Sequence, residues 1–416
     1  MAILKLKPSC KDYLWGGTRL MTEFGKEYDG DKLAETWELS YHPDGPSYVA
    51  NGEYAGETLS EYILMEGKKV TGTHSRHYSQ FPLLIKFIDA KDDLSIQVHP
   101  DDEYAMKNEG QYGKTEMWYI VDCEEGASLY YGFSREVSKE EFEERIKNKT
   151  LLEVLNKVEV HKGDVLFIEP GTIHAIGKGN LIAEIQENSN VTYRVYDYGR
   201  KDANGKERDL HIEKALQVTK RVPILRKKSF EPHIVDCDYF TVDKVVLDGQ
   251  RMKKIFGEID KTSFASLLVL DGTGKVQSGE ECVEVQKGDS VFITANAGEY
   301  EMEEKFEAAV NEAKAAGLDI TYEILGIRPC SGDVDKERQA RLLERAKAAV
   351  ETVTGICLGV GSGSTDCNIP LSMGIPSVCV GCYSGAGAHT REEYVEEASL
   401  PLGYRVAFEM IFGGRS

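Results

Sequence analysis

The chain has 416 residues, enough for two or three domains, and its formal net charge of −20 argues against nucleic acid or an anionic membrane as a partner. Its first residues contain no apolar core long enough for a signal peptide, and no later run is long enough to span a bilayer. Nine cysteines without regular spacing indicate reduced thiols, so the composition predicts a soluble protein of the cytoplasm.

The first informative element is a predicted β-strand over residues 94–100. Gln97 and His99 are two residues apart, so on a strand their side chains point to the same side. Ile96 and Val98 then face the core. This strand therefore carries two candidate metal ligands on one face.

A second predicted strand begins near Glu116. The segment 113–120 places this carboxylate at the start of an apolar run. Lys114 lies two residues earlier and is expected to point into the same cavity. The alternative for Lys114 is a solvated lysine at a strand entrance.

A short helix is predicted over residues 138–146, between strands of the first β-domain. Phe142 and Ile146 share one face, and Ser138 followed by Glu141 has the spacing of a capping box. We interpret this segment as a helical insertion.

A buried strand within residues 163–174 ends at a Pro-Gly turn that presents His174. Together with Gln97, His99 and Glu116 this gives two imidazoles, a carboxylate and an amide oxygen, a donor set that suits zinc and leaves room for water or substrate. Any one of these residues alone would more often be an ordinary polar side chain. Their combination predicts a zinc site with one ion per chain.

One segment of the sequence occurs twice. Val158–Ile168 returns as Val283–Ile293, and each copy is a strand, a Lys-Gly-Asp turn and a buried strand. The repeat predicts two β-barrels of the same type in succession. The second copy continues without a histidine, so the second barrel is expected to lack a metal site.

Three segments surround the candidate ligands: Ser-Ile-Gln-Val-His-Pro-Asp-Asp (95–102), Gly-Lys-Thr-Glu-Met-Trp-Tyr (113–119) and Glu-Pro-Gly-Thr-Ile-His-Ala-Ile (169–176). They resemble the signatures of type I mannose-6-phosphate isomerases, which are zinc-dependent cupins. Further segments in the family's order lie at 13–17, 34–37, 42–47, 82–86 and 209–216. The resemblance runs from about residue 6 to residue 302.

The resemblance implies a mainly β fold with two cupin-type (jelly-roll) β-barrels. The first, residues 1–230, would hold the metal and the helical insertion, and the second, residues 231–303, would support it. It also implies an aldose–ketose isomerase that interconverts mannose 6-phosphate and fructose 6-phosphate through a cis-enediol. A divalent ion bound by the substrate's carbonyl and its neighbouring hydroxyl would lower the barrier to moving a proton between the two carbons.

The resemblance also assigns roles to single residues. It places catalytic roles on Lys114, Arg194 and Glu184, and contact with the phosphate of the hexose phosphate on Ser95 and Lys114. Glu184 and Arg194 could also form a salt bridge inside the barrel.

Lys86 and Glu35 are weaker matches and are expected to lie behind the ligands. The chain departs from relatives at two positions: Gly113 stands where some carry a histidine, and Ile176 where others carry a tyrosine. The identities of the ring-opening acid and of the base therefore stay open.

After the second barrel the pattern changes to helix. Residues 304–313 have a 3.6-residue apolar rhythm, and a second helix over 335–354 would end at Gly355. A Gly/Ser-rich turn at 359–370 and an apolar strand over 376–380 follow. We expect an incomplete, poorly packed α/β segment, and an exposed edge where the second barrel lacks its final strand.

Residues 364–371, 374–376 and 387–394 of this tail resemble the C-terminal part of M20-family metallopeptidases. The resemblance covers residues 304–416. In that family the histidine that corresponds to His389 binds a metal, but the other ligands come from an N-terminal half with no counterpart in this chain. We therefore interpret the tail as a catalytically incomplete fragment.

Two other functions stay open at this point. A cupin that only binds a sugar phosphate would use the same pocket without turnover. A peptidase acting through residues 304–416 is the weaker alternative.

Overall fold

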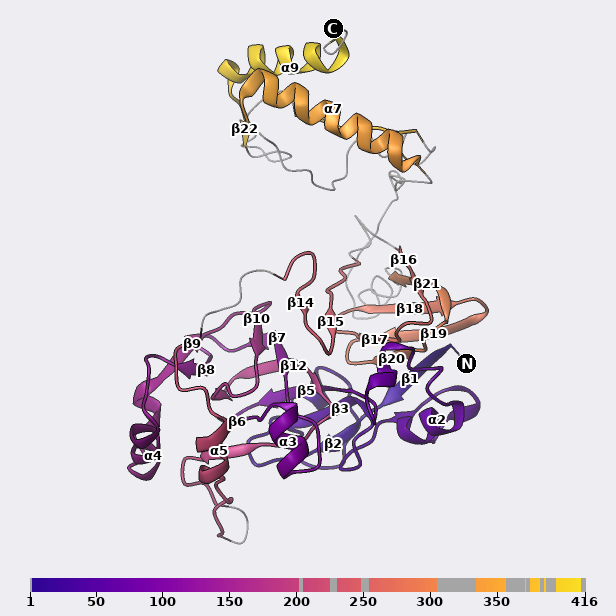
Figure 1. Cartoon of the computed structure of the whole chain (residues 1–416). Coiled ribbons are helices and arrows are strands. Elements are labelled where there is room, and N and C mark those ends of the chain that lie inside the picture. Colours follow the sequence, from indigo (N-terminus) through magenta and orange to yellow (C-terminus); the bar gives the residue numbers. More distant parts are fainter. Residues whose placement is uncertain are drawn as a thin grey trace, which may run out of the picture. The chain divides into compact units, whose positions relative to one another are not determined.

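The computed structural model describes residues 2–201, 205–224, 230–247, 254–304, 334–356, 371, 375–381, 385–386 and 394–412 (Figure 1). The chain forms two compact units, residues 1–316 and 317–416. Within the described ranges, none of the helices is both long and apolar enough to cross a membrane.

The first β-domain contains two antiparallel sheets. One has the strand order β10-β7-β12-β5-β3-β2 and the other the order β13-β6-β11-β8-β9. The strands of these sheets are β2 Ser9–Lys11, β3 Glu35–Ser40, β5 Leu83–Ala90, β6 Ile96–Val98, β7 Glu116–Cys123, β8 Ser128–Phe133, β9 Leu155–Glu159, β10 Val165–Ile168, β11 His174–Ile176, β12 Asn180–Glu187 and β13 Tyr193–Tyr196. Apolar residues of both sheets, such as Trp118 and Ile176, share one buried core. The mainly β, cupin-type fold is confirmed.

The second β-domain has two four-stranded sheets, ordered β17-β20-β1-β4 and β16-β21-β18-β19. Their strands are β1 Ile3–Lys7, β4 Tyr48–Val49, β16 Lys254–Ile259, β17 Ala265–Leu268, β18 Thr273–Ser278, β19 Glu281–Gln286, β20 Ser290–Ile293 and β21 Gly298–Glu304. Because β1 pairs with β20, the first strand of the chain lies in a sheet of this second domain. A hairpin of β14 (Val235–Asp236) and β15 (Thr241–Val242) precedes it. The predicted boundaries at residues 230 and 303 stay predictions.

The two copies of the sequence repeat have the same turn. Gly163 and Gly288 have φ angles of 95° and 93°, which favour glycine. In the first copy Asp164 Oδ2 accepts a hydrogen bond from the backbone N–H of His161 at 2.8 Å. In the second copy Asp289 Oδ2 accepts one from Gln286 N–H, also at 2.8 Å. The predicted strand–turn–strand repeat is therefore confirmed in local detail.

Among the described residues up to 304, the α-helices beside the β-domains are α1 Arg19–Thr22, α2 Leu59–Glu66, α3 Asp102–Asn108, α4 Lys139–Lys147 and α5 Ile212–Val218. Helix α4 is the predicted insertion between β8 and β9, and it buries Phe142 and Ile146 as expected. Ser138 accepts a hydrogen bond from Glu141 N–H at 3.0 Å. The second hydrogen bond of a capping box, from the backbone N–H of Ser138 to the Glu141 carboxylate, is not formed. The Glu141 carboxylate accepts from Arg135 and Arg145 instead.

The last strand before residue 305, β21, is an interior strand. It pairs with β16 on one side and β18 on the other. The sequence predicts an exposed sheet edge after residue 303, and this edge is therefore not on β21. Glu304 belongs to this strand rather than to a helix, and the rest of the helix predicted over 304–313 lies outside the described residues.

In the second unit, the predicted helix over 335–354 is confirmed as α7 (Lys336–Thr354), capped by the Asp335 carboxylate and closed by Gly355 at φ 72°. The strand predicted over 376–380 is wrong. The backbone of Ser377 forms its hydrogen bonds with a side chain of α7 instead of with another strand. Its N–H donates to Gln339 Oε1 and its carbonyl accepts from Gln339 Nε2, both at 2.9 Å.

The remaining elements of this unit are β22 Gly385–Ala386, β23 Tyr394–Val395 and α9 Leu400–Phe412. Helix α9 leaves Tyr404, Phe408 and Ile411 exposed, in keeping with the expected loose packing. The peptidase-like residues 364–370 and His389 lie outside the described residues.

Candidate metal centre

The four predicted ligands come from three strands of the first β-domain. Glu116 is the first residue of β7, His174 the first of β11, and Gln97 the middle residue of β6. His99 lies just beyond the end of β6 rather than on it. Strands β6 and β11 pair with Gln97 opposite His174, which brings these two side chains to one face.

His99, Glu116 and His174 form a buried group whose ligand atoms all lie within 4.8 Å of one another. Glu116 Oε1 is 3.2 Å from His174 Nε2, and Glu116 Oε2 is 3.8 Å from His99 Nε2. The side-chain nitrogen of Gln97 is 3.5 Å from His174 Nε2. Since amide nitrogen and oxygen exchange places by rotation, the Gln97 oxygen can face the same point.

Both imidazoles have a defined tautomer. His99 Nδ1 lies 2.8 Å from the Val191 carbonyl, and His174 Nδ1 lies 2.9 Å from the Thr172 carbonyl. A carbonyl only accepts, so each Nδ1 carries the proton and donates it. Each Nε2 therefore offers its lone pair toward Glu116, as metal-binding histidines do.

The electrostatics of the group favour a cation. Burial, together with Lys114, lowers the pKa of His99 well below its usual range, and burial lowers the pKa of His174 to about 4. Burial raises the pKa of Glu116 to about 7. Within the described part of the chain, Glu116 Oε1 accepts no hydrogen bond, while Oε2 is ion-paired with Lys114 Nζ at 2.7 Å. Two neutral imidazoles and an under-bonded carboxylate fit a divalent ion.

Lys114 lies against this group. Its Nζ is 2.7 Å from Glu116 Oε2, 3.3 Å from His99 Nε2 and 3.6 Å from Glu184 Oε1. The side chain is buried, so the alternative of a solvated lysine at a strand entrance is wrong. Its ammonium group lies beside the Glu116 carboxylate, on the side that the sequence predicts.

Glu184 connects Lys114 to a second buried lysine. Its Oε1 accepts from Lys86 Nζ at 3.1 Å, and its Oε2 accepts from Trp118 Nε1 at 2.9 Å. Burial would raise the pKa of Glu184, but Lys114 and Lys86 outweigh burial and hold it at about 2. The carboxylate therefore stays ionised.

Lys86 continues this chain of charges. Its Nζ is 3.8 Å from Glu35 Oε2, which also accepts from Trp37 Nε1 at 2.8 Å. Burial would lower the pKa of Lys86, but Glu184 and Glu35 raise it above its usual value. Lys86 lies within the fully buried strand β5. A lysine in such an apolar strand is itself a sequence signal for a buried ion pair, because a buried ammonium requires partners.

Arg194 does not form the salt bridge with Glu184 that stood as an alternative to its catalytic role. Its Nε donates to Ser95 Oγ at 3.3 Å and its Nη1 donates to the Asp209 carbonyl at 3.1 Å. The reason is register: Arg194 on β13 lies opposite Gln97, whereas Glu184 on β12 lies opposite Lys86 in the other sheet.

Arg194 opens onto a hollow of about 380 Å³. Its lining consists of Arg194, Lys206, Glu207, Arg208, Asp209 and His211. Three of these six side chains are cationic, and Ser95 is bound to Arg194 at its inner side. The sequence did not single out Lys206 and Arg208, whose proximity depends on the loop after β13.

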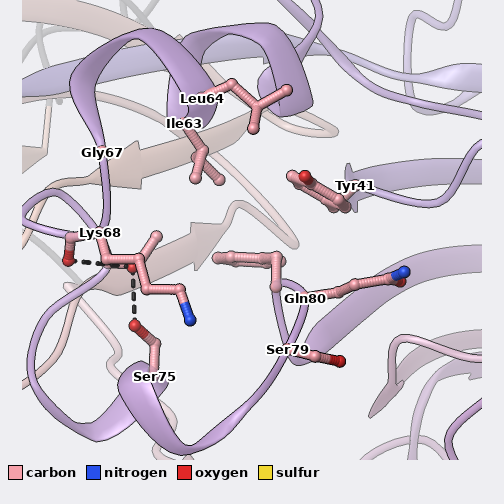
Figure 2. Close-up of a pocket in the computed structure, with 10 residues that line it drawn as sticks. Tyr41, Ile63, Leu64, Gly67, Lys68, Ser75, Ser79 and Gln80 are labelled. Atoms are coloured by element: carbon pink, nitrogen blue, oxygen red, sulfur yellow. Dashed lines mark hydrogen bonds between the residues drawn. The ribbon is translucent and has the colours of Figure 1, made fainter.

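A separate hollow of about 170 Å³ lies beside helix α2 (Figure 2). Ile63 and Leu64 of the helix, Tyr41, Phe81 and Lys68 line part of it. It shares no residue with the metal group or with the cationic hollow, so we do not assign the substrate to it.

Two histidines and a glutamate converging between jelly-roll sheets define a cupin-type metal centre. Residues 3–126 match the phosphomannose isomerase type I catalytic domain, and residues 231–312 match the mannose-6-phosphate isomerase cupin domain. The mannose-6-phosphate isomerase ManA of Bacillus subtilis is 39% identical over 325 residues, which cover 74% of this chain and 98% of the relative. The Streptococcus mutans mannose-6-phosphate isomerase is 39% identical over 289 residues, covering 67% and 88%. The chain belongs to the type I phosphomannose isomerase family.

Solved structures agree. The crystal structure of the mannose 6-phosphate isomerase from Bacillus subtilis has 35% identity and a TM-score of 0.65, and the match covers 73% of this chain and 97% of the other. The Salmonella typhimurium structure, at 17% identity and a TM-score of 0.55 over 74% and 100% of the two chains, supports the fold alone. The M20 resemblance of residues 304–416 stays a prediction.

Proposed function

We propose that this chain interconverts mannose 6-phosphate and fructose 6-phosphate with one zinc ion per chain. The observation that carries the proposal is the buried group of His99, Glu116 and His174, whose two Nε2 atoms converge on an under-bonded carboxylate. Gln97 would complete the ligand set through its amide oxygen. Family membership supports the reaction.

The residues around the metal group are arranged to hold and move a proton. A zinc ion bound there would polarise the sugar's carbonyl and the adjacent hydroxyl, which would acidify the C–H bond on the carbon that bears this hydroxyl. Lys114 is the cation nearest the ligands, and Glu184 orients it together with Lys86. We therefore assign proton transfer between C1 and C2, through a cis-enediol, to this Lys114–Glu184 pair.

The hollow at Arg194 supports the hexose phosphate as substrate. Arg194 lies on β13 opposite Gln97, and Ser95 directly precedes β6, the strand that carries Gln97. A sugar reaching from the metal would therefore place its far end near Arg194 and Ser95. Arginine fits phosphate oxygens with two donors. We propose that Ser95 and Arg194 bind the phosphate with Arg208 and Lys206. Lys114 was also predicted to bind phosphate, but its contacts are to the metal group.

The test is a coupled assay of fructose 6-phosphate formation on EDTA-treated protein, with and without added zinc, in H2O and in D2O. Zinc should restore turnover, and the product formed in D2O should carry deuterium at C1, because an enediol exchanges its proton with solvent. Product free of deuterium would contradict the enediol. Binding of mannose 6-phosphate without turnover in zinc-loaded protein would favour a sugar-phosphate-binding protein.

His99→Ala should abolish zinc binding and turnover, whereas the matched change His161→Ala should leave both intact. The His161 side chain is 76% exposed in the turn before β10. As part of the same proposal, we place this enzyme in the cytoplasm.

A further inference from the structure

Two carboxyl groups bind the peptide groups on either side of Lys114. The backbone N–H of Gly113 donates to Asp102 Oδ1 at 2.7 Å, and the N–H of Thr115 donates to Glu187 Oε1 at 2.6 Å. Lys114 N–H donates to the Pro100 carbonyl at 3.1 Å. Three successive amides are thus bound, which fixes the backbone that carries Lys114 and leads into Glu116.

Glu187 binds this segment twice. Besides its side chain, its own backbone N–H donates to the Thr115 carbonyl at 3.1 Å. Glu187 is the last residue of β12 and is only 2% exposed. Its carboxyl group is therefore a rigid support for Thr115 rather than a surface charge.

The two carboxyl groups also contact each other. Burial and the neighbouring Asp102 raise the pKa of Glu187, so at neutral pH one of the two carboxyl groups carries a proton. Tyr239 Oη donates a hydrogen bond to Asp102 Oδ2 at 3.1 Å. Tyr78 and Cys237 lie near Glu187, and both are neutral at pH 7 because burial raises the pKa of each. Among these groups the only further charge is Asp238, which acts on Tyr78 and Cys237.

We propose that Glu187 and Asp102 are a proton-sharing pair that positions Lys114 and Glu116 for the reaction. The pair acts through the backbone of residues 113–115 and touches neither substrate nor metal. This inference rests on the proposed function of Lys114. A protonated Glu187 can donate to the Asp102 carboxylate while Oε1 accepts from Thr115 N–H.

The pair has a consequence for pH dependence. Burial, with Asp102 next in importance, raises the pKa of Glu187 to about 8. Below that pH Glu187 is neutral and bonds to Asp102. Above it two adjacent carboxylates repel each other, so the segment around Lys114 loosens and kcat falls.

Glu187→Gln and Glu187→Ala separate positioning from folding. Glutamine keeps an acceptor for Thr115 and a donor for Asp102 but cannot ionise, whereas alanine loses both. We expect Glu187→Ala to lower kcat about tenfold or more with little change in KM. Glu187→Gln should recover most of that loss and abolish the decline of kcat above pH 8. Glu159→Gln, at an exposed position on β9, is the control.

A second readout does not depend on turnover. Amide hydrogen exchange at Thr115 should be at least tenfold faster in Glu187→Ala than in wild type and close to wild type in Glu187→Gln. Unchanged exchange in the alanine variant, or an alkaline decline of kcat retained in the glutamine variant, would overturn the inference. If wild type lacked zinc-dependent turnover, the proposed function would fail, while Thr115 exchange would still decide the pairing.

Discussion

Glu184→Gln is the sharpest probe of the charge network behind the metal. The change keeps the shape of the side chain and an oxygen for Trp118 Nε1, but removes the negative charge between Lys86 and Lys114. Two buried ammonium groups then lose their shared counter-ion. Both stability and turnover should fall.

The magnitude follows from the pKa of Glu184. It lies at about 2 against an ordinary 4.5, a difference of about 2.5, and each pKa unit corresponds to about 1.4 kcal/mol. The ionised form therefore contributes about 3 kcal/mol to folding at neutral pH. Loss of one partner from a buried ion pair costs a similar amount, about 3–5 kcal/mol.

The lowered pKa of Glu184 determines whether its contribution to stability rises or falls with pH. Because this pKa is depressed in the folded state, the stabilisation is complete above pH 4.5 and disappears as pH falls toward 2. The difference in unfolding free energy between wild type and Glu184→Gln should therefore shrink across that window.

Urea titration followed by tryptophan fluorescence measures this, since Trp15, Trp37 and Trp118 are all buried in the first β-domain. The variant should lose about 3 kcal/mol at pH 7 and about a hundredfold in kcat. Glu159→Gln on the exposed face of β9 should change neither. A loss below about 1 kcal/mol at pH 7, typical of a surface pair, would refute the network.

Three further outcomes are expected. Zinc affinity of metal-free protein should fall about tenfold per pH unit below pH 7, because Glu116 (pKa about 7) must release a proton on binding; a flat profile in a competition titration would exclude Glu116 as a ligand. Arg194→Met should raise KM for mannose 6-phosphate at least tenfold and leave kcat/KM for unphosphorylated mannose, measured in parallel, unchanged; equal losses on both sugars in steady-state kinetics would argue against phosphate contact. Ser138→Ala, which removes the N-cap of α4, should destabilise the first β-domain by about 1 kcal/mol in urea titration, and an unchanged midpoint would contradict that role for the cap.

The candidate metal ligands could be singled out from the sequence because each lies in a short local pattern. Gln97 and His99 are two residues apart at a strand, Glu116 begins a buried strand, and His174 follows a Pro-Gly turn. The duplicated Lys-Gly-Asp turn likewise predicted two similar β-domains. In each case neighbours in sequence carry the information.

Other parts of the site depend on contacts between distant residues. The alternative of a Glu184–Arg194 salt bridge is wrong because β12 and β13 belong to different sheets. The same β12 register sets Glu184 against Lys86 and Trp118, so both partners come from other strands. No local pattern identifies them.

The tail shows a different limit. The apolar run at 376–380 satisfies the sequence criteria for a strand, but Gln339 of α7 takes both backbone hydrogen-bonding groups of Ser377. A strand requires a partner strand at that place, and periodicity alone does not reveal one. The capped helix α7 could be predicted because its end signals at Asp335 and Gly355 are local.

The most direct test of the central claim is the initial rate of fructose 6-phosphate formation while zinc is titrated back into EDTA-treated protein. Wild type and His174→Ala are measured side by side, with zinc content determined on the same samples. The wild-type rate should rise to a plateau at about one zinc per chain, while the variant should stay at background. Full turnover without zinc, or a zinc-restored rate in His174→Ala, would contradict this claim.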